Sequence, residues 1–285
     1  MKKLALMAII GISVLSGCAS VQTEAEWKLK KDYTVAFHST ACGYETASYC
    51  ISGGLLGETH YSLDGGLSWQ KGSKTAVSCR MGLDILDAKT AFTSGEAGIA
   101  RTDDGGITWT GINHIQFDEV SFLDADNGWA GRDTLLQVTA DGGLHWNTVI
   151  MPDGFGPVAS LSASSPDVVS VIDDGGRFIR SDDRGKSWQT PGKAIEIVGY
   201  ACIFHISALR TSSGESVLMA VYARRGNKTG WLLLESRNKG KTWSHEEIDG
   251  TFGNSFLGHP YLSHDGTLFT VSDSGLNRIT LYSRE

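Results

Sequence analysis

One short phrase recurs five times along the chain and constrains its fold more than any other feature. Each copy has a Ser or Thr, an acidic or amide residue two or three positions later, a Gly and a final Trp, at steps of 40, 37, 42 and 55 residues. A repeat of this length indicates an array of similar structural units. The copies are YSLDGGLSW at 61–69, RTDDGGITW at 101–109, VTADGGLHW at 138–146, RSDDRGKSW at 180–188 and ESRNKGKTW at 235–243.

The chemistry of the phrase predicts a tight turn between two strands. A carboxylate or amide accepts hydrogen bonds from amides of its own turn, and Gly adopts positive φ at no steric cost. The Trp then begins the next strand with a large apolar side chain to bury between neighbouring units. We therefore expect the repeated residues to serve the fold and not to form a site. They are Asp64, Gly66, Trp69, Asp104, Gly106, Trp109, Asp141, Gly143, Trp146, Asp183, Gly185, Trp188, Asn238, Gly240 and Trp243.

The segments between the repeated phrases predict strands. They contain short runs rich in Val, Ile, Phe and Thr, such as 90–95 and 168–173, separated by Gly, Asp and Asn. No stretch after residue 20 has a sustained helical period. The chain is therefore expected to be all-β.

The repeated phrase resembles the Asp-box, or BNR, repeat, which in that family forms the turn between the third and fourth strands of a blade in sialidase-type β-propellers. Around the third copy the resemblance extends to the blade pattern of the Ycf48-like photosystem assembly factors. It covers that blade well and the others loosely, and it implies a single propeller domain. Propellers of these families are binding platforms or glycosidases, so the resemblance does not choose between the two. The residues that carry the closer resemblance are Val120, Ser121, Phe122, Asp124, Gly128, Trp129 and Gly131.

The two ends of the chain predict how the ring closes. Trp27 has no repeated phrase before it, and the C-terminal strand has no such Trp after it. We expect the N-terminal strand around Trp27 to complete the last blade, which would leave no open sheet edge and give six four-stranded blades. Seven blades are the alternative if the 55-residue step contains a further unit. We expect that step instead to contain a long hairpin with its tip at 224–228.

The first residues predict a secretory signal that ends in a lipobox. Lys2 and Lys3 precede an apolar stretch, which is followed by Leu-Ser-Gly and Cys18. At about 14 residues, this stretch is too short to span a bilayer of about 30 Å. The pattern resembles bacterial lipoproteins, in which the signal is removed and the cysteine is lipidated. The resemblance implies a signal at 1–17, a lipidated tether at 18–25 and a propeller at 26–285, anchored in the outer membrane and facing the periplasm or, alternatively, the cell surface.

The charge of the chain argues against a nucleic-acid partner. The formal net charge is −7, from 25 basic and 32 acidic side chains. Phosphate backbones are bound by surfaces with an excess of Lys and Arg, which this composition does not supply.

Cysteine usage fits an oxidising compartment. Apart from Cys18, four cysteines remain, which permits three pairings. Cys42 and Cys50 enclose a short loop, so a local disulfide between them is the simplest pairing. Cys79 and Cys202 either form a second disulfide or remain buried thiols. No C-x-x-C pair suggests a metal site.

The sequence lacks the features of a sialidase active site. Such enzymes combine a Tyr nucleophile, two carboxylates and clustered arginines that clamp the substrate carboxylate. None of the arginines is followed by Ile-Pro, the motif that the family places ahead of its first box. Arg80, Arg132 and Arg210 would have to converge from separate parts of the chain. We therefore predict no catalytic residue, and also no cofactor.

Other catalytic or metal-binding patterns are also missing. The eight histidines show no metal-ligand spacing, and no G-x-S-x-G elbow occurs. The segment 124–128 has acidic residues like a calcium loop but lacks the alternating ligands and the later Glu. No metal site is therefore predicted.

These observations favour recognition over catalysis. We expect a non-catalytic lipoprotein that binds a protein partner in the cell envelope, as an assembly factor or a periplasmic inhibitor. The alternative is a carbohydrate-active propeller, either a diverged sialidase-type glycosidase or a glycan-binding module. The candidate contact residues are those of the 224–228 tip and of an aromatic stretch near the C-terminus: Arg224, Arg225, Lys228, Phe252, Phe256, His259 and Tyr261.

Overall fold

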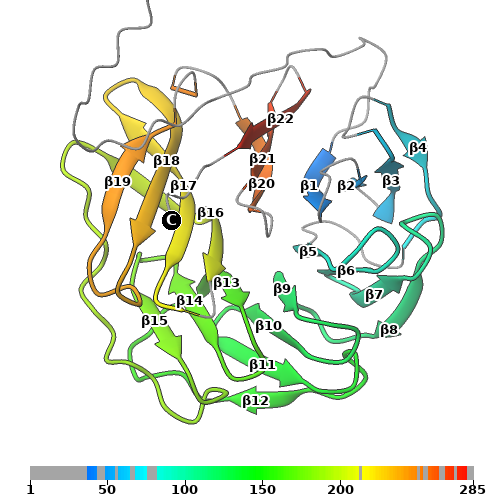
Figure 1. The fold of residues 1–285 in the computed structure, drawn as a ribbon, viewed down its shortest axis with the longest axis horizontal. Helices are drawn as coiled ribbons and strands as arrows, with labels where there is room; N and C mark the ends of the chain where they lie inside the picture. Colours follow the sequence, from blue (N-terminus) through cyan, green and yellow to red (C-terminus); the bar gives the residue numbers. More distant parts are fainter. Residues whose placement is uncertain are drawn as a thin grey trace, which may run out of the picture.

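The computed structural model describes residues 37–43, 49–54, 57–64, 68–75, 82–211, 214–248, 251–252, 256–262, 267–272 and 275–280. These residues form strands arranged in a ring around a central axis (Figure 1), which is a single all-β propeller. Among them, no helix has the length and apolar character needed to cross a membrane.

The strands form five hydrogen-bonded sheets, which we number as blades along the chain. Blade 1 has the order β22-β21-β20-β1-β2-β3-β4, and blades 2 to 5 are β5–β8, β9–β12, β13–β15 and β16–β19. The strand bounds in blades 1 and 2 are β1 Phe37–Gly43, β2 Tyr49–Gly54, β3 Thr59–Ser62, β4 Gln70–Lys71, β20 Phe256–Leu262, β21 Thr267–Ser272, β22 Gly275–Thr280, β5 Gly82–Ile85, β6 Ala91–Gly95, β7 Gly98–Thr102 and β8 Thr110–Asn113. In blades 3 to 5 they are β9 Glu119–Phe122, β10 Gly128–Arg132, β11 Leu135–Thr139, β12 Asn147–Val149, β13 Val158–Ala163, β14 Val169–Asp173, β15 Phe178–Ser181, β16 Ala201–Thr211, β17 Val217–Arg225, β18 Lys228–Ser236 and β19 Ser244–Glu247.

The prediction of six separate blades is wrong. Ser39 in β1 pairs in parallel with His259 in β20, so the first and last parts of the chain join edge to edge in one seven-stranded sheet. The strands β1 and β20 hydrogen bond to each other here, and this pairing closes the ring. Trp27, on which the expected closure depended, lies outside the described residues. The 55-residue step adds no seventh blade, because it contains the long hairpin of β17 and β18.

The repeated phrases form the predicted turns. They connect β3 to β4, β7 to β8, β11 to β12 and β18 to β19, and the fourth follows β15. In the second turn, the Thr102 hydroxyl donates to Asp104 Oδ1 at 2.9 Å and accepts from the Gly106 N–H at 2.8 Å. The Asp104 carboxylate also accepts from the Thr108 N–H at 2.8 Å and from the Thr108 hydroxyl at 2.6 Å. The carboxylates of Asp64, Asp141 and Asp183 accept equivalent bonds. In the fifth turn Asn238 Oδ1 accepts from the Ser236 hydroxyl and the Thr242 N–H, and its amide nitrogen donates to the Thr242 hydroxyl.

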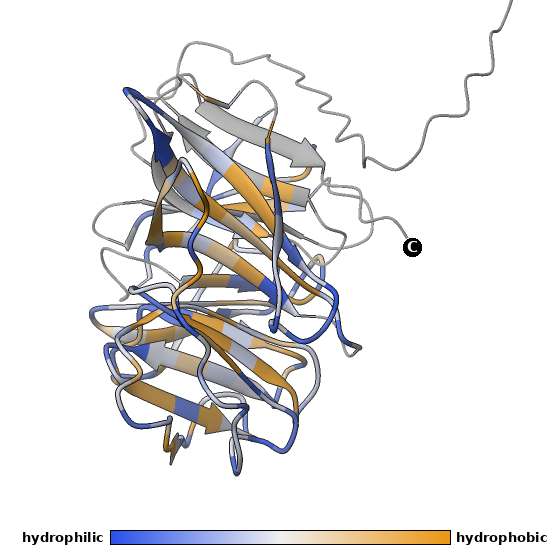
Figure 2. Cartoon of the chain, turned by 90° about the vertical axis from the view of Figure 1, so that its left-hand side faces the viewer, coloured by the Kyte–Doolittle hydropathy of each residue, from blue (hydrophilic) through white to orange (hydrophobic). Residues whose placement is uncertain are grey.

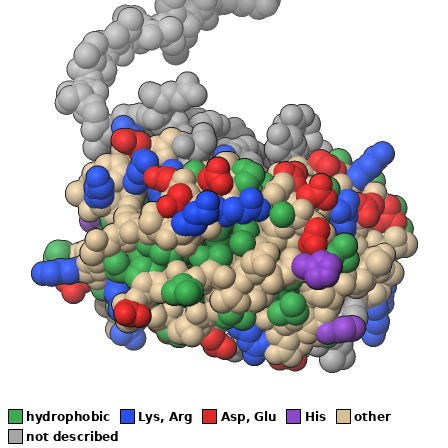
Figure 3. Space-filling model, turned by 90° about the horizontal axis from the view of Figure 1, so that it is seen from below, with side chains coloured by type: hydrophobic (Ala, Val, Ile, Leu, Met, Phe, Trp, Pro, Cys, Tyr) green, Lys and Arg blue, Asp and Glu red, His purple; other side chains and the backbone are tan. Residues whose placement is uncertain are grey.

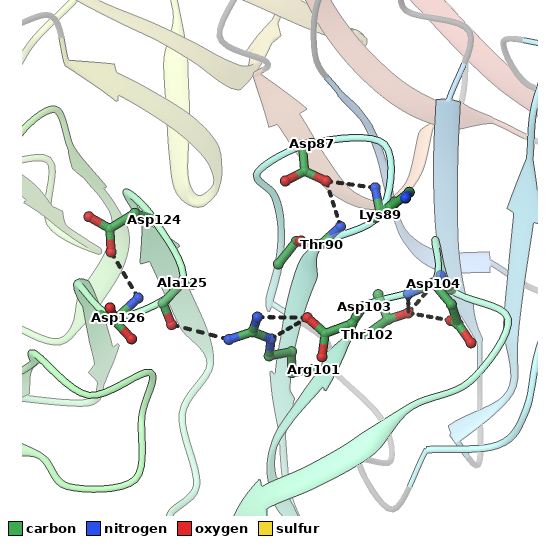
Figure 4. Close-up of polar contacts among 11 residues, drawn as sticks. Asp87, Lys89, Thr90, Arg101, Thr102, Asp103, Asp104, Asp124, Ala125 and Asp126 are labelled. Carbon is green, nitrogen blue, oxygen red and sulfur yellow. Dashed lines mark hydrogen bonds and ion pairs between the residues drawn. The ribbon is translucent and has the colours of Figure 1, made fainter.

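The repeat turns also connect neighbouring blades. Arg101 of blade 2 forms an ion pair with Asp103 at 2.6 Å and donates to the Ala125 carbonyl of blade 3 at 3.3 Å (Figure 4). Arg180 of blade 4 donates in the same way to the Gly214 carbonyl of blade 5 at 2.9 Å. Each guanidinium therefore satisfies a carbonyl in the loop of the following blade.

Apolar side chains fill the spaces between blades. Apolar residues follow the strands, while hydrophilic residues lie in the loops (Figure 2). Each repeat Trp is half-buried. Four of them pack in clusters shared with the preceding blade, as predicted, whereas Trp69 packs with Cys50 and Tyr261 of its own sheet. The Phe92 ring of blade 2 stacks on Phe122 of blade 3 with centroids 3.5 Å apart, so aromatic side chains of two blades pack directly against each other. Each of these four Trp side chains packs against a buried apolar cluster that contains a residue of the preceding blade: Trp109 with Ile51, Trp146 with Phe92, Trp188 with Trp129 and Trp243 with Phe178.

Side chains of one innermost strand bind the backbone of the next. Asp84 of β5 accepts from the Phe122 N–H at 2.6 Å, and Ser121 of β9 accepts from the Ala163 N–H at 3.1 Å. Two serines of β13 accept from the Leu209 N–H at 3.2 Å and the Thr211 N–H at 2.9 Å. These bonds satisfy amides on strand edges that face the ring centre, where an unpaired donor would be costly.

Cys50 is disulfide-bonded, and the register of β1 and β2 places Cys42 directly opposite it. The pairing of these two cysteines remains our prediction. Cys202 has a free thiol, so the optional bridge to Cys79 is absent, and Cys79 itself lies outside the described residues. Cys18 and Gly66 also lie outside them.

Candidate functional site

The strand directions divide the loops between two faces of the ring. Successive strands in each blade are antiparallel, so second-to-third strand hairpins and connections between blades lie on one face. We call it the connection face. The repeat turns, which join third to fourth strands, lie on the opposite face. The 224–228 tip belongs to the connection face, because it joins the second and third strands of blade 5.

The 224–228 tip has the predicted form. Arg225 pairs with Lys228 across a two-residue turn in which Gly226 has a φ of 59°, and residues 224–228 are all exposed. Arg224 and Lys228 therefore extend into solvent on the connection face.

Arg225 belongs to a compact group of side chains, which we call the rim cluster: Tyr200, Arg225, Glu247 and Phe252. The guanidinium of Arg225 lies 5.3 Å from the Phe252 ring centroid and 5.8 Å from that of Tyr200. It forms an ion pair with Glu247, and the Tyr200 hydroxyl donates to Glu247 at 2.5 Å. This bond to Glu247, followed by burial, raises the pKa of Tyr200. The cluster holds a half-exposed cation, with 51% of its side chain accessible, in a fixed position against two aromatic rings.

The sequence analysis placed Arg225 and Phe252 in two separate candidate surfaces, and the structure brings them together. It missed Tyr200 and Glu247, which lie at the end of a connection and on an edge strand. The remaining residues of the predicted aromatic stretch do not join the cluster. Phe256 and His259 lie on β20, and their side chains are outside the described part of the structure. Tyr261 lines the central channel instead.

The central channel is the second candidate site. It is a hollow of about 80 Å³ lined by the innermost strands β5, β9, β13, β16 and β20. Its charged and phenolic groups are Asp84, Glu119, Arg210 and Tyr261. The Tyr261 hydroxyl donates to Asp84 at 3.4 Å.

Ionisation in the channel is strongly perturbed. Burial, with smaller contributions from the carboxylates of Asp118 and Asp84, raises the pKa of Glu119 to about 8. Burial and the negative charge of Asp84 raise the pKa of Tyr261 well above its usual value, while Arg210 acts in the opposite direction. Such shifts mark candidate functional groups but also occur in structural networks.

The three arginines considered for a substrate clamp do not come together. Arg210 lines the channel, whereas Arg132 ends β10, where it bonds Gln116 and forms an ion pair with Asp133 at 3.6 Å. Arg80 lies outside the described residues. Within the described part of the chain, no group of three His, Cys, Asp or Glu side chains is placed to hold a metal ion.

The side of the ring drawn in Figure 3 carries charges of both signs. In the view of Figure 3, Lys and Arg side chains alternate with Asp and Glu around apolar groups. The face drawn there therefore lacks the basic patch that binding to phosphate backbones requires.

Neither protein-family models nor curated proteins match the sequence. Solved structures share its fold. YCF48 bound to D1 peptide superposes with a TM-score of 0.58 at 18% identity, over 90% of this chain and 82% of that one. YCF48 from Cyanidioschyzon merolae gives 0.57 at 13% identity, over 88% and 97%. An ancestral GH74 enzyme gives 0.58 at 13% identity, over 92% of this chain but 38% of that one. At these identities the similarity shows the β-propeller fold alone.

Proposed function

We propose that this chain is a non-catalytic propeller that binds a protein partner through its connection face. The rim cluster carries the proposal. Arg and Tyr are enriched among the residues that dominate protein interfaces, and an immobilised guanidinium loses less conformational entropy on binding. YCF48 bound to D1 peptide supports the proposal, because a propeller of the same fold accommodates a peptide.

We further propose that the protein is an envelope lipoprotein. The lipobox at Cys18 and the Asp-box resemblance motivate this setting, in which the lipid would hold the propeller at the periplasmic side of the outer membrane. Replacing Cys18 by Ala should release the full-length protein from the membrane fraction and abolish labelling by radioactive palmitate. Retention of the variant in washed membranes, with the label intact, would contradict the lipid anchor.

The experiment for partner binding is affinity purification from envelope extracts with the wild-type protein and an Arg225→Ala variant. We expect a protein that is enriched by the wild type and reduced about tenfold or more by the variant, since truncating an interface hot spot costs about 2 kcal/mol or more. Lys241→Ala is the matched control, because Lys241 is an exposed cation on the repeat-turn face. Equal enrichment by all three proteins, or no enriched protein, would refute the proposal.

A carbohydrate-active role is the alternative, because the channel places Arg210 and Tyr261 together with two carboxyl groups. The hollow of about 80 Å³ is small for such a role, since ligand pockets usually measure about 300–1,000 Å³. Turnover of a fluorogenic sialoside by the wild type, lost in Tyr261→Phe, would favour this alternative over the binding role.

A further inference from the structure

The polar residues of the innermost strands form two levels around the channel. Side chains two positions apart share one face of a strand, and the bonds between strands align Asp84 with Ser121 and Ser121 with Ser162. Ser162 in turn accepts a bond from the Thr211 N–H, which places the adjacent Arg210 at the same level. We call this the lower ring. The residues two positions earlier form the upper ring: Gly82, Glu119, Ser160 and Ala208.

Glu119 is the charged member of the upper ring as the structure describes it. Its companions there are small, and a Cβ atom on Gly82 would lie 3.2 Å from the Glu119 Cα. The described members from β5, β13 and β16 are Gly82, Ser160 and Ala208, and their small side chains leave room in the hollow beside Glu119.

The Glu119 carboxyl differs from the other polar groups of the innermost strands. Asp84, Ser121, Ser160 and Ser162 each accept an N–H from the next strand. Among the described residues, no hydrogen bond or ion pair involves the Glu119 carboxyl. A carboxyl group without a partner in such a place stays protonated, and a bound cation would offset the cost of ionising it.

The charges that face Glu119 favour a cation as its partner. Asp118 directly precedes it at the end of the connection and Asp84 faces it from β5, and both carboxylates act on it. Among the described side chains that line the channel, the other titratable groups are Arg210 from β16 and Tyr261 from β20, and the guanidinium of Arg210 acts on Tyr261. The electrostatic potential that these carboxylates create at Glu119 is therefore negative.

We infer that the upper ring of the channel binds the ammonium group of a lysine side chain presented by a protein partner. An ammonium has three N–H donors, which the Glu119 carboxyl and the oxygen of Ser160 could accept, and a narrow alkyl stem that fits a small hollow. Glu119 is the first residue of β9, directly after a connection between blades. The upper ring thus opens on the connection face, and a partner docked at the rim cluster would cover it. This inference rests on the proposed protein-binding function.

The test uses full-length protein titrated with n-propylammonium chloride, followed by calorimetry, with 1-propanol as the uncharged analogue. We expect the ammonium to bind and propanol not to bind. Glu119→Gln should weaken ammonium binding by about tenfold or more, the usual worth of a charge-assisted hydrogen bond. Asp167→Asn is the matched control, since Asp167 is an exposed carboxylate between β13 and β14 that does not line the channel, and should change affinity by less than about threefold. Equal affinity in Glu119→Gln and wild type, or equal binding of propanol, would overturn the inference.

A second measurement remains decisive if Glu119→Gln fails to fold. The ammonium binds the ionised carboxylate, so wild-type affinity should rise at least about fivefold from pH 6 to pH 9, while propylammonium itself stays charged. An affinity that is constant across this range would overturn the inference. If propylammonium does not bind but a partner is still enriched in an Arg225-dependent way, the channel site alone is refuted. If propylammonium binds but no Arg225-dependent partner is enriched, the proposed function alone is refuted.

Discussion

Gly240 and Phe178 fit together across two blades: a Cβ atom on Gly240 would lie 2.1 Å from Cε1 of the Phe178 ring. Gly185 has the same relation to Val149, with a separation of 2.3 Å. The glycine of these repeat turns therefore meets two requirements, a φ near +80° and room for a side chain of the preceding blade.

Replacing Gly240 by Ala should destabilise the protein by about 3 kcal/mol or more, because left-handed strain and overpacking add. Gly226→Ala is the control, since Gly226 also has positive φ but nothing lies within 4 Å of its added Cβ. Strain alone should cost it about 1–2 kcal/mol. Urea unfolding of both variants measures the difference, and equal losses would contradict the packing role.

Asp183→Asn should leave the fourth turn intact near neutral pH, because Asn238 forms the equivalent bonds in the fifth. Bonds from the Ser187 hydroxyl and N–H, and from Ser181, lower the pKa of Asp183 to about 2. Its ionisation therefore adds stability above about pH 4, which is lost as the pH falls towards 2. The free energy of unfolding, measured from pH 2 to 6, should fall less steeply in Asp183→Asn. Parallel curves would contradict this account.

Glu119 should make the protein less stable at high pH. Its pKa is raised to about 8, so the folded state holds a proton that the unfolded state releases near pH 4.5. The contribution of this group to the free energy of unfolding is fully present below about pH 4.5 and is lost as the pH rises through 8. Glu119→Gln should therefore gain stability over the wild type at pH 9 relative to pH 5 in urea unfolding. The exposed Glu96→Gln is the control and should show no such gain.

Reduction of the Cys50 disulfide should cost about 2–3 kcal/mol if its partner is Cys42, the value expected for a loop of this length. Peptide mapping without reductant should recover a fragment that links the two cysteines, while Cys202 reacts with an alkylating agent after unfolding. A fragment that links Cys50 to Cys79 or Cys202 would contradict the predicted pairing.

Local features of the fold could be read from the sequence. The repeat turns and the 224–228 hairpin depend on neighbouring residues, such as Thr102 with Asp104 or Arg225 with Lys228, so their chemistry is visible in short stretches. The number of blades was predicted wrongly because the pairing of Ser39 with His259, residues at opposite ends of the chain, joins their strands in one sheet. No local pattern encodes such a contact.

The sites were harder to predict for the same reason. Arg225 and Phe252 were identified as candidates, but their meeting with Tyr200 depends on two loops packing together. Glu119 was missed, although one signal was present. It stands two positions before Ser121 in an otherwise apolar strand, as Ser160 stands before Ser162. This spacing of polar residues, recurring in successive innermost strands, marks positions that face the channel.

The bonds between innermost strands have a consequence for how the ring unfolds. The acceptor, such as Ser121, belongs to one blade and the donor N–H of Ala163 to the next. In blades 2 to 5 these inner edges are therefore satisfied by the neighbouring blade, and losing one of these blades leaves a buried donor or acceptor in its neighbour. The ring should melt as one cooperative unit in calorimetry, without the stepwise transitions of an open solenoid.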